Sequence, residues 1–452
     1  MKWSLNRIAL LLVFVISLVW SSLLAQMPGY PAPRWPDLPT IETVEDLMPY
    51  ARIFVEREYE NLNPGIGLKR GEKVLYITTS LTDPMVVQAI CRAIIEMGGD
   101  YTLVLRESVE VHPAAGLRAR GQPSPPTPAW LTEAMSAHDI ILGPSPGNVA
   151  GQMYTMHAVK SGKPYRLVWM PYTMPSLLAS QHMTFPTELL QWISDKVWNE
   201  IEGSREIRIT EPEGTDITFY MDDAGWKRYR EGWVSIGGDE KSRFADRNEK
   251  WKNWTQAIRP GHLTFDPALA SKGATGVIVA SHLHSDVIPR MKWYVEDGQV
   301  TRIEGGGGVG EVLGELHQKH SAINFGWYRG TGSNWIEEVS LAMNPKAHRV
   351  YPLEEYVKRG TRVSFGAGRK RSGHIHIAVG SGPTRVVEGV PRQHLDVEIY
   401  FPTMWVDGKK IVDKGDLLAL EDPETRAFAA KFGDPDELLK VEWVPRVVGV
   451  NN

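Results

Sequence analysis

The stretch that decides the fold of the second half of the chain is GHIHIAVGSGPTRVVEGVPRQHLDVEIYFPTMWVDG, residues 373–408. It contains two runs in which polar and apolar residues alternate, and a β-strand places residues i, i+2 and i+4 on one face. His374 and His376 therefore share a face of the first run, and His394 and Asp396 share a face of the second. Because imidazole and carboxylate groups are ordinary ligands of zinc, iron, cobalt and manganese, the stretch predicts a metal site built on a sheet.

Two other patterns indicate strands without predicting ligands. The segment Trp405–Gly408 (WVDG) ends in the Asp-Gly pair that is typical of a tight hairpin turn. His282, His284 and Asp286 alternate along another run, SHLHSD. For these three residues the pattern favours the exposed polar face of an antiparallel strand over a metal triplet.

Two further segments offer candidate ligands. Glu337 and Glu338 lie in Trp335–Met343, which we predict to be helical, so that the two carboxylates point to different sides and one of them faces inwards. A buried carboxylate needs a cation or a donor, and a metal would supply this. His262 follows a Pro-Gly turn, from which a side chain can enter a cleft.

The length and charge of the chain limit its function. A chain of 452 residues predicts two or three domains. Its composition, with 42% hydrophobic and 23% charged residues, is that of an ordinary globular protein. The net charge is −4, with neither a basic excess nor a long block of one charge, so we expect no nucleic-acid partner.

The N-terminal segment differs from the rest of the chain. Lys2 and Arg7 form a short basic start, Ile8–Leu24 is mostly apolar, and Ala25 is a small residue at the end of the run. This layout predicts a signal peptide over residues 1–25 and a secreted or periplasmic protein. The alternative is an uncleaved anchor, which would be the chain's contact with a membrane.

Proline content and the order of the expected strands and helices divide the remaining chain into three parts. Residues 26–42 are rich in proline and predict an extended linker. In residues 43–203 short apolar strands alternate with helices and no G-x-G-x-x-G follows a strand, which predicts an α/β domain with a mostly parallel sheet and no dinucleotide cofactor. Residues 204–452 are rich in strands, with clear helical patterns at 309–317 and 335–343, and predict an α+β domain that carries the metal site.

The order of these motifs resembles that of the aminopeptidase T family of metallo-aminopeptidases and their aminopeptidase S relatives. The similarity runs from about residue 43 to residue 416. The motifs that carry it are Pro49-Tyr50-Ala51, Gly71-Glu72, Glu338 ahead of Asn344-Pro345, His376-Ile377-Ala378-Val379-Gly380, His394-Leu395-Asp396 and Asp407-Gly408.

The resemblance implies a metal-dependent hydrolase, either an aminopeptidase or a related amidase, that acts on a short peptide or another small molecule and forms a homodimer. It implies one or two divalent ions of zinc, cobalt, manganese or iron, with ligands at Glu338, His376, His394 and Asp396. Where the family has a glutamate on a Pro-Gly turn, this chain has His262. We expect His262 to be a ligand or a general base, and Glu338 to belong to the catalytic set as well.

Two departures from the family leave the chemistry open. With His262 in place of a glutamate, the summed charge of the ligands falls from −3 to −2. The smaller charge suits one metal better than two, because two cations would repel each other more strongly. The family also has a catalytic tyrosine soon after the His-x-Ala-x-Gly strand, whereas the next tyrosine here is Tyr400.

A related offshoot, the 2,5-dihydroxypyridine 5,6-dioxygenases, is similar in fold and holds one iron with two histidines and one carboxylate. It has a histidine where this chain has Glu338. A ring-cleaving iron dioxygenase with Phe325–Tyr328 lining its pocket is therefore an alternative function. A non-catalytic exported binding protein is another.

Overall fold

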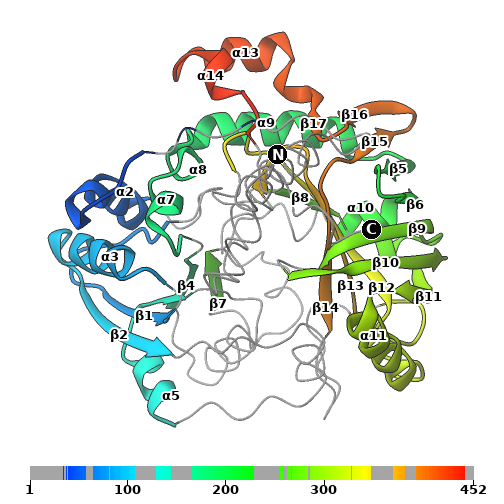
Figure 1. The fold of residues 1–452 in the computed structure, drawn as a ribbon, viewed down its shortest axis with the longest axis horizontal. Helices are drawn as coiled ribbons and strands as arrows, with labels where there is room; N and C mark the ends of the chain where they lie inside the picture. The colour runs from blue at the N-terminus through cyan, green and yellow to red at the C-terminus, as the bar shows by residue number, and fades with distance from the viewer. Residues whose placement is uncertain are drawn as a thin grey trace, which may run out of the picture.

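The described residues of the computed structural model form two β-sheets, one parallel and one antiparallel (Figure 1). The predicted signal peptide and His284 lie outside the residues that the structure describes. Within the described part, no helix is both long and apolar enough to cross a membrane. The described residues are 34, 37, 39–57, 65–80, 82–106, 129–143, 165–170, 172–228, 254–257, 262–265, 267–283, 286–326, 328–347, 370–381 and 393–442.

In the part of the chain that the structure describes, the first sheet has five parallel strands in the order β2-β1-β3-β4-β7. Helices α2, α3 and α5 lie near its strands β1 and β2 in the blue and cyan part of Figure 1, and β7 is the green strand of this sheet. This arrangement confirms the predicted α/β unit with a parallel sheet. The strands are β1 (Lys73–Thr79), β2 (Asp100–Arg106), β3 (Ile140–Gly143), β4 (Tyr165–Trp169) and β7 (Trp254–Ala257), and the helices are α2 (Val44–Glu56), α3 (Pro84–Glu96), α5 (Ala129–Ser136), α7 (Pro175–Leu178) and α8 (Gln181–Thr184).

Helix α2 shows how the local sequence starts this unit. Thr43 and Asp46 form a capping box, in which each side chain accepts a hydrogen bond from the other residue's backbone N–H. Leu47, Ala51 and Phe54 follow at helical spacing and are fully buried. The apolar face of α2 therefore packs into the core of the first unit, where α3 is its main helical neighbour.

Within the described residues, the second sheet is antiparallel and has twelve strands, in the order β10-β11-β12-β13-β14-β9-β6-β5-β15-β16-β17, with β8 paired to β12. It confirms the predicted strand-rich α+β unit. The strands are β5 (Glu206–Thr210), β6 (Asp216–Tyr220), β8 (His262–Phe265), β9 (Thr275–Leu283), β10 (Asp286–Glu296), β11 (Gln299–Gly305), β12 (Trp335–Ala342), β13 (Ile375–Gly380), β14 (His394–Ile399), β15 (Thr403–Val406), β16 (Lys409–Asp413) and β17 (Asp416–Leu417). The helices of this half are α9 (Thr187–Ile201), α10 (Asp223–Arg228), α11 (Gly307–His320), α13 (Pro423–Ala429) and α14 (Pro435–Leu438), with short 3₁₀ turns η4 (Pro267–Leu269) and η6 (Leu418–Leu420).

Two elements belong to a different unit from the one that their position relative to residue 203 predicts. Strand β7 follows residue 203 in the chain but pairs with β4 in the first sheet. Helix α9 precedes residue 203, yet its buried residues Leu189, Ile193 and Val197 belong to the core of the second unit. The chain therefore passes between the two cores more than once.

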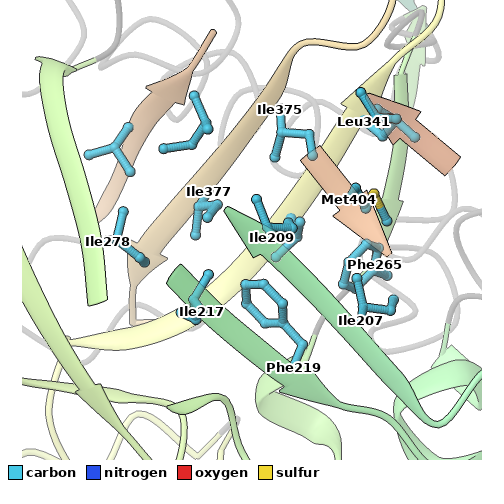
Figure 2. Close-up of a cluster of buried hydrophobic side chains, with 14 of the residues drawn as sticks. Ile207, Ile209, Ile217, Phe219, Phe265, Ile278, Leu341, Ile375, Ile377 and Met404 are labelled. Atoms are coloured by element: carbon cyan, nitrogen blue, oxygen red, sulfur yellow. The ribbon is translucent and has the colours of Figure 1, made fainter. Parts of the chain in front are cut away.

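One face of the second sheet is a continuous apolar core. Ile375 and Ile377 of β13 point into it together with Ile209 of β5 and Ile217 of β6 (Figure 2). Each such buried side chain contributes roughly 1.5–3 kcal/mol of transfer free energy. Because side chains alternate along a strand, the residues between these isoleucines point to the opposite face of the sheet.

The segment 335–343 corrects a prediction. We expected a helix, but Trp335–Ala342 is strand β12, and all eight of its residues are buried. The strand pairs with β13 on one side and β8 on the other, so its backbone hydrogen bonds are made to distant parts of the chain. These pairings override a local pattern that resembles an amphipathic helix.

The predicted turn at Asp407-Gly408 is confirmed, and it belongs to the hairpin that follows β14. It joins β15 and β16, and both of its residues have positive φ angles, 46° for Asp407 and 82° for Gly408. Positive φ at both central residues is the mark of the tight turn that matches strand twist. The Asp407 carboxylate also accepts hydrogen bonds from the backbone N–H groups of Arg205 and Glu206, which ties the hairpin to β5.

Candidate metal centre

The register of β12, β13 and β14 brings the predicted ligands together. Glu338 lies opposite Ala378, and Ala378 lies opposite Asp396. His376 is two residues before Ala378, and His394 is two residues before Asp396, so all four side chains project from the polar face of three adjacent strands. These residues, three of which the sequence marked by alternation, thus form a single cluster of carboxylate and imidazole groups.

Glu338 is the residue that links the two histidines. His376 Nε2 lies 3.0 Å from Glu338 Oε1, and His394 Nε2 lies 3.7 Å from Glu338 Oε2. His394 Nε2 also lies 3.0 Å from Asp396 Oδ1. The side chain of His394 is 28% exposed, whereas those of Glu338, His376 and Asp396 are at most 11% exposed, so the cluster is most open at His394.

The neighbouring carboxylate, Glu337, also belongs to the cluster. A β-bulge interrupts the pairing of β12 with β13 between Ile336 and Glu338, so that Glu337 has no partner of its own in the ladder. Its carboxylate forms a short hydrogen bond with His394 Nδ1. The prediction that the two glutamates point to different sides, with only one of them facing inwards, is therefore wrong. Both are buried, and both contact the same imidazole.

Two neighbouring hydroxyl groups hold the Glu338 carboxylate in place. Ser340 Oγ donates a hydrogen bond of 2.7 Å to Glu338 Oε1, and Thr264 Oγ1 lies 2.6 Å from Ser340 Oγ. All three residues are buried. Ser340 is two residues from Glu338 and shares its face of the sheet, so the sequence contained this neighbour, although nothing marked its role.

The pKa values of Glu338 and His394 are shifted more by the attraction between carboxylates and imidazoles than by burial. Burial alone would raise the pKa of Glu338, but the hydrogen bond from His376 and the charges of His394 and His376 hold it well below its usual value. Burial alone would lower the pKa of His394, but Asp396 and Glu337 outweigh this and raise it to about 10. Histidine binds metals through an unprotonated nitrogen, so metal binding at His394 Nε2 would release a proton.

A second imidazole–carboxylate pair lies beside the cluster. His374 Nε2 is 2.5 Å from Glu398 Oε2, and both side chains are fully buried. The rings of His374 and His282 each lie 4.9 Å from that of Tyr400. The expectation that His282 lies on an exposed face is wrong, because His282 is 1% exposed and is packed in this group.

His262 is placed only by its backbone. It is the first residue of β8 and lies opposite Ala342 in β12, two residues from the Thr264–Ser340 pair. Its side chain is outside the described part of the structure, as is that of Asp286. The assignment of His262 as a ligand or general base therefore stays a prediction.

The donor chemistry of the cluster fits a divalent cation. Two carboxylates and two imidazoles project from adjacent strands, and a buried, ionised carboxylate such as Glu338 requires a positive partner. In the described residues, no three or more His, Cys, Asp or Glu side chains are arranged so that they could hold a metal ion as they stand. Their nitrogen and oxygen atoms contact one another in a hydrogen bond and ion pairs instead, and an ion would have to replace these contacts.

The fold and this donor set define a class, the metal-dependent enzymes built from a parallel α/β unit followed by an antiparallel sheet. A family model described as 2,5-dihydroxypyridine 5,6-dioxygenase matches residues 64–419, and the chain belongs to that family. No match was found among curated protein sequences.

Two solved structures are similar to this chain at low identity. A 2,5-dihydroxypyridine dioxygenase from Pseudomonas putida KT2440 is 16% identical, with a TM-score of 0.48 and coverage of 85% of this chain and 100% of that chain. AmpT, aminopeptidase T from Thermus thermophilus, is 14% identical, with a TM-score of 0.48 and coverage of 83% of this chain and 99% of that chain. The family match agrees with one of the two families that the sequence motifs resemble, the 2,5-dihydroxypyridine 5,6-dioxygenases.

Proposed function

We propose that this protein is a metal-dependent hydrolase that cleaves an amide bond in a short peptide or another small molecule. The observation that carries the proposal is the position of Glu338, a second carboxylate in contact with both imidazoles of the cluster. A donor set with equal numbers of carboxylates and imidazoles differs from the two-histidine, one-carboxylate triad of iron oxygenases.

In this proposal Glu338, His376, His394 and Asp396 hold one divalent cation. When bound, the cation would lower the pKa of a water molecule and polarise the carbonyl of the substrate. Ser340 and Thr264 keep the Glu338 carboxylate oriented through their hydrogen bonds. The substrate approaches at His394, the most exposed of the four side chains.

The test is hydrolysis by protein that has been stripped and then reloaded with zinc, cobalt, manganese or ferrous iron. Release of arylamine from a panel of aminoacyl anilides, and cleavage of short peptides, should require metal and should be lost in His394→Ala. Glu442→Gln is a matched control, because Glu442 is a buried carboxylate paired with Lys346 at 3.0 Å outside the cluster. Absence of metal-dependent release from every substrate of the panel would contradict the proposal.

A second candidate, a ring-cleaving iron dioxygenase, is favoured by the family match over residues 64–419. His376, His394 and Asp396 supply two imidazoles and one carboxylate, which is the composition of the ferrous triad. Anaerobic loading with ferrous iron, followed by measurement of oxygen uptake with hydroxylated pyridines, distinguishes the two reactions. Uptake coupled to loss of the ring absorbance would favour this candidate over hydrolysis.

Export and dimer formation are part of the same proposal. The basic start and apolar run of residues 1–25 support export, and sequencing the N-terminus of the protein recovered outside the cytoplasm tests it. A mature chain that begins near Gln26 is the expected result. Homodimer formation rests on the resemblance to the aminopeptidases, and light scattering after gel filtration would measure it.

A further inference from the structure

We infer that Glu337 is a positioning residue, which holds the imidazole of His394 in the orientation needed to bind metal. This inference rests on the proposed metal site and adds a residue to it. It starts from a contact that no ligand motif includes, the hydrogen bond between the Glu337 carboxylate and His394 Nδ1.

The two nitrogens of His394 face different partners. Nδ1 meets Glu337, while Nε2 faces Asp396 at 3.0 Å and Glu338 at 3.7 Å. A carboxylate that accepts the Nδ1 proton fixes the tautomer of a neutral imidazole, so that the Nε2 lone pair is free for a metal. Glu337 therefore acts through His394, whereas Glu338 and Asp396 lie where they can reach the metal themselves.

The backbone is shaped to make this contact. In a regular strand Glu337 and Glu338 would point to opposite faces, and only one of them could reach His394. The bulge between Ile336 and Glu338 removes that restriction, and bulges next to functional sites commonly redirect a side chain in this way.

Gly380 provides the space for the Glu337 carboxylate. Gly380 lies opposite His394 in the β13–β14 ladder. A Cβ atom added to it would overlap with Glu337 Oε1 and with the backbone oxygen of Gln393. The glycine of the His-x-Ala-x-Gly motif is thus explained by packing: it leaves room beside the histidine for its carboxylate partner.

The experiment measures binding of Co²⁺ to the full-length chain and to Glu337→Ala and Glu337→Gln. Isothermal titration gives the affinity, and the visible ligand-field spectrum reports the geometry of the bound ion. We expect Glu337→Ala to weaken Co²⁺ binding by about 10- to 100-fold and to alter the spectrum. Glu337→Gln keeps an oxygen that can accept the Nδ1 proton, so it should lose less affinity and keep a spectrum close to that of the parent.

Thermal unfolding of the metal-free proteins separates this role from a general loss of stability. Glu442→Gln, which removes charge from another buried pair, should lower the melting temperature without weakening Co²⁺ binding. If Glu337→Ala does not fold, Glu337→Gln decides, and reduced affinity in a folded Gln variant supports the inference. Parent-like affinity and spectrum in the folded variants would overturn the inference and leave the hydrolase proposal standing. Failure of the parent itself to bind Co²⁺ would overturn both.

Discussion

The two faces of strands β12, β13 and β14 differ in what they contribute. One face carries Ile375, Ile377 and Val397 into a core of almost completely buried aliphatic side chains. The other carries His376 and Asp396 among buried groups that are joined by hydrogen bonds and ion pairs. The same backbone thus supplies stability on one side and chemistry on the other, and each can be changed while the other is kept.

The largest effect should follow from a change on the polar face. Asp396→Asn keeps the size of the side chain but removes the charge next to His394. We expect the metal-dependent rate to fall by about 10²- to 10³-fold, since a metal supplies several kcal/mol of transition-state stabilisation. Steady-state kinetics of the metal-loaded protein measure this, and a rate within twofold of the parent would contradict the assignment of Asp396 as a ligand.

The matched change on the apolar face is Ile377→Ala. Ile377 is fully buried, between His376 and Ala378 in the chain but on the opposite side of the sheet. Truncation should lower the free energy of unfolding by about 2–5 kcal/mol, measured by urea titration. The folded fraction should keep its metal affinity. Loss of metal binding at unchanged stability would show that the two faces are not separable.

A smaller effect should follow from removing the hydroxyl that supports Glu338. Ser340→Ala deletes the donor of the 2.7 Å hydrogen bond, which as a bond to a charged group is worth about 1.5–3 kcal/mol. We expect metal affinity to weaken by about tenfold. Thr264→Ser keeps a hydroxyl next to Ser340 and serves as the control, with affinity close to that of the parent.

The smallest expected effect is on the stability of the protein at acidic pH. It involves His317 of helix α11, which packs on β10 and β11. Burial, and next the charge of His320, lower the pKa of His317 to about 4. The unfolded chain therefore binds more protons than the folded protein between about pH 6.5 and 4, so this contribution to stability is complete above that window and is lost as the pH falls through it. His317→Gln should flatten the pH dependence of the unfolding free energy within this window. An unchanged pH profile in urea titrations would contradict the prediction.

Much of the fold could be predicted from local patterns. The parallel strands β1 to β4 with helices α2, α3 and α5, the strand-rich second unit, helix α11 and the Asp407-Gly408 turn all follow from periodicity and turn chemistry, whereas strand β7 was not predicted. Strand β12 could not be predicted in this way, because all eight of its residues are buried and the bulge at Glu337 breaks the two-residue period of a strand. Buried strands and buried helices look alike over so short a run.

The candidate site, too, could be predicted only in part from the sequence. Alternation alone indicated that His394 and Asp396 share a face of one strand, and that His374 and His376 share a face of a second strand, because side-chain direction along a strand is a local property. Which of these side chains come into contact depends on the register between strands that are far apart in the sequence. His374 proved to pair with Glu398 rather than with the four-residue cluster.

The sequence by itself determined the kind of groups available and the face of the strand from which each projects, since both follow from composition and a two-residue period. Only the tertiary structure decided that Glu337 joins Glu338 at His394. That outcome needs a bulge in β12 and a histidine in β14 that lies opposite a glycine in β13. A bulge exists only relative to a paired strand, so no local pattern in β12 could indicate it.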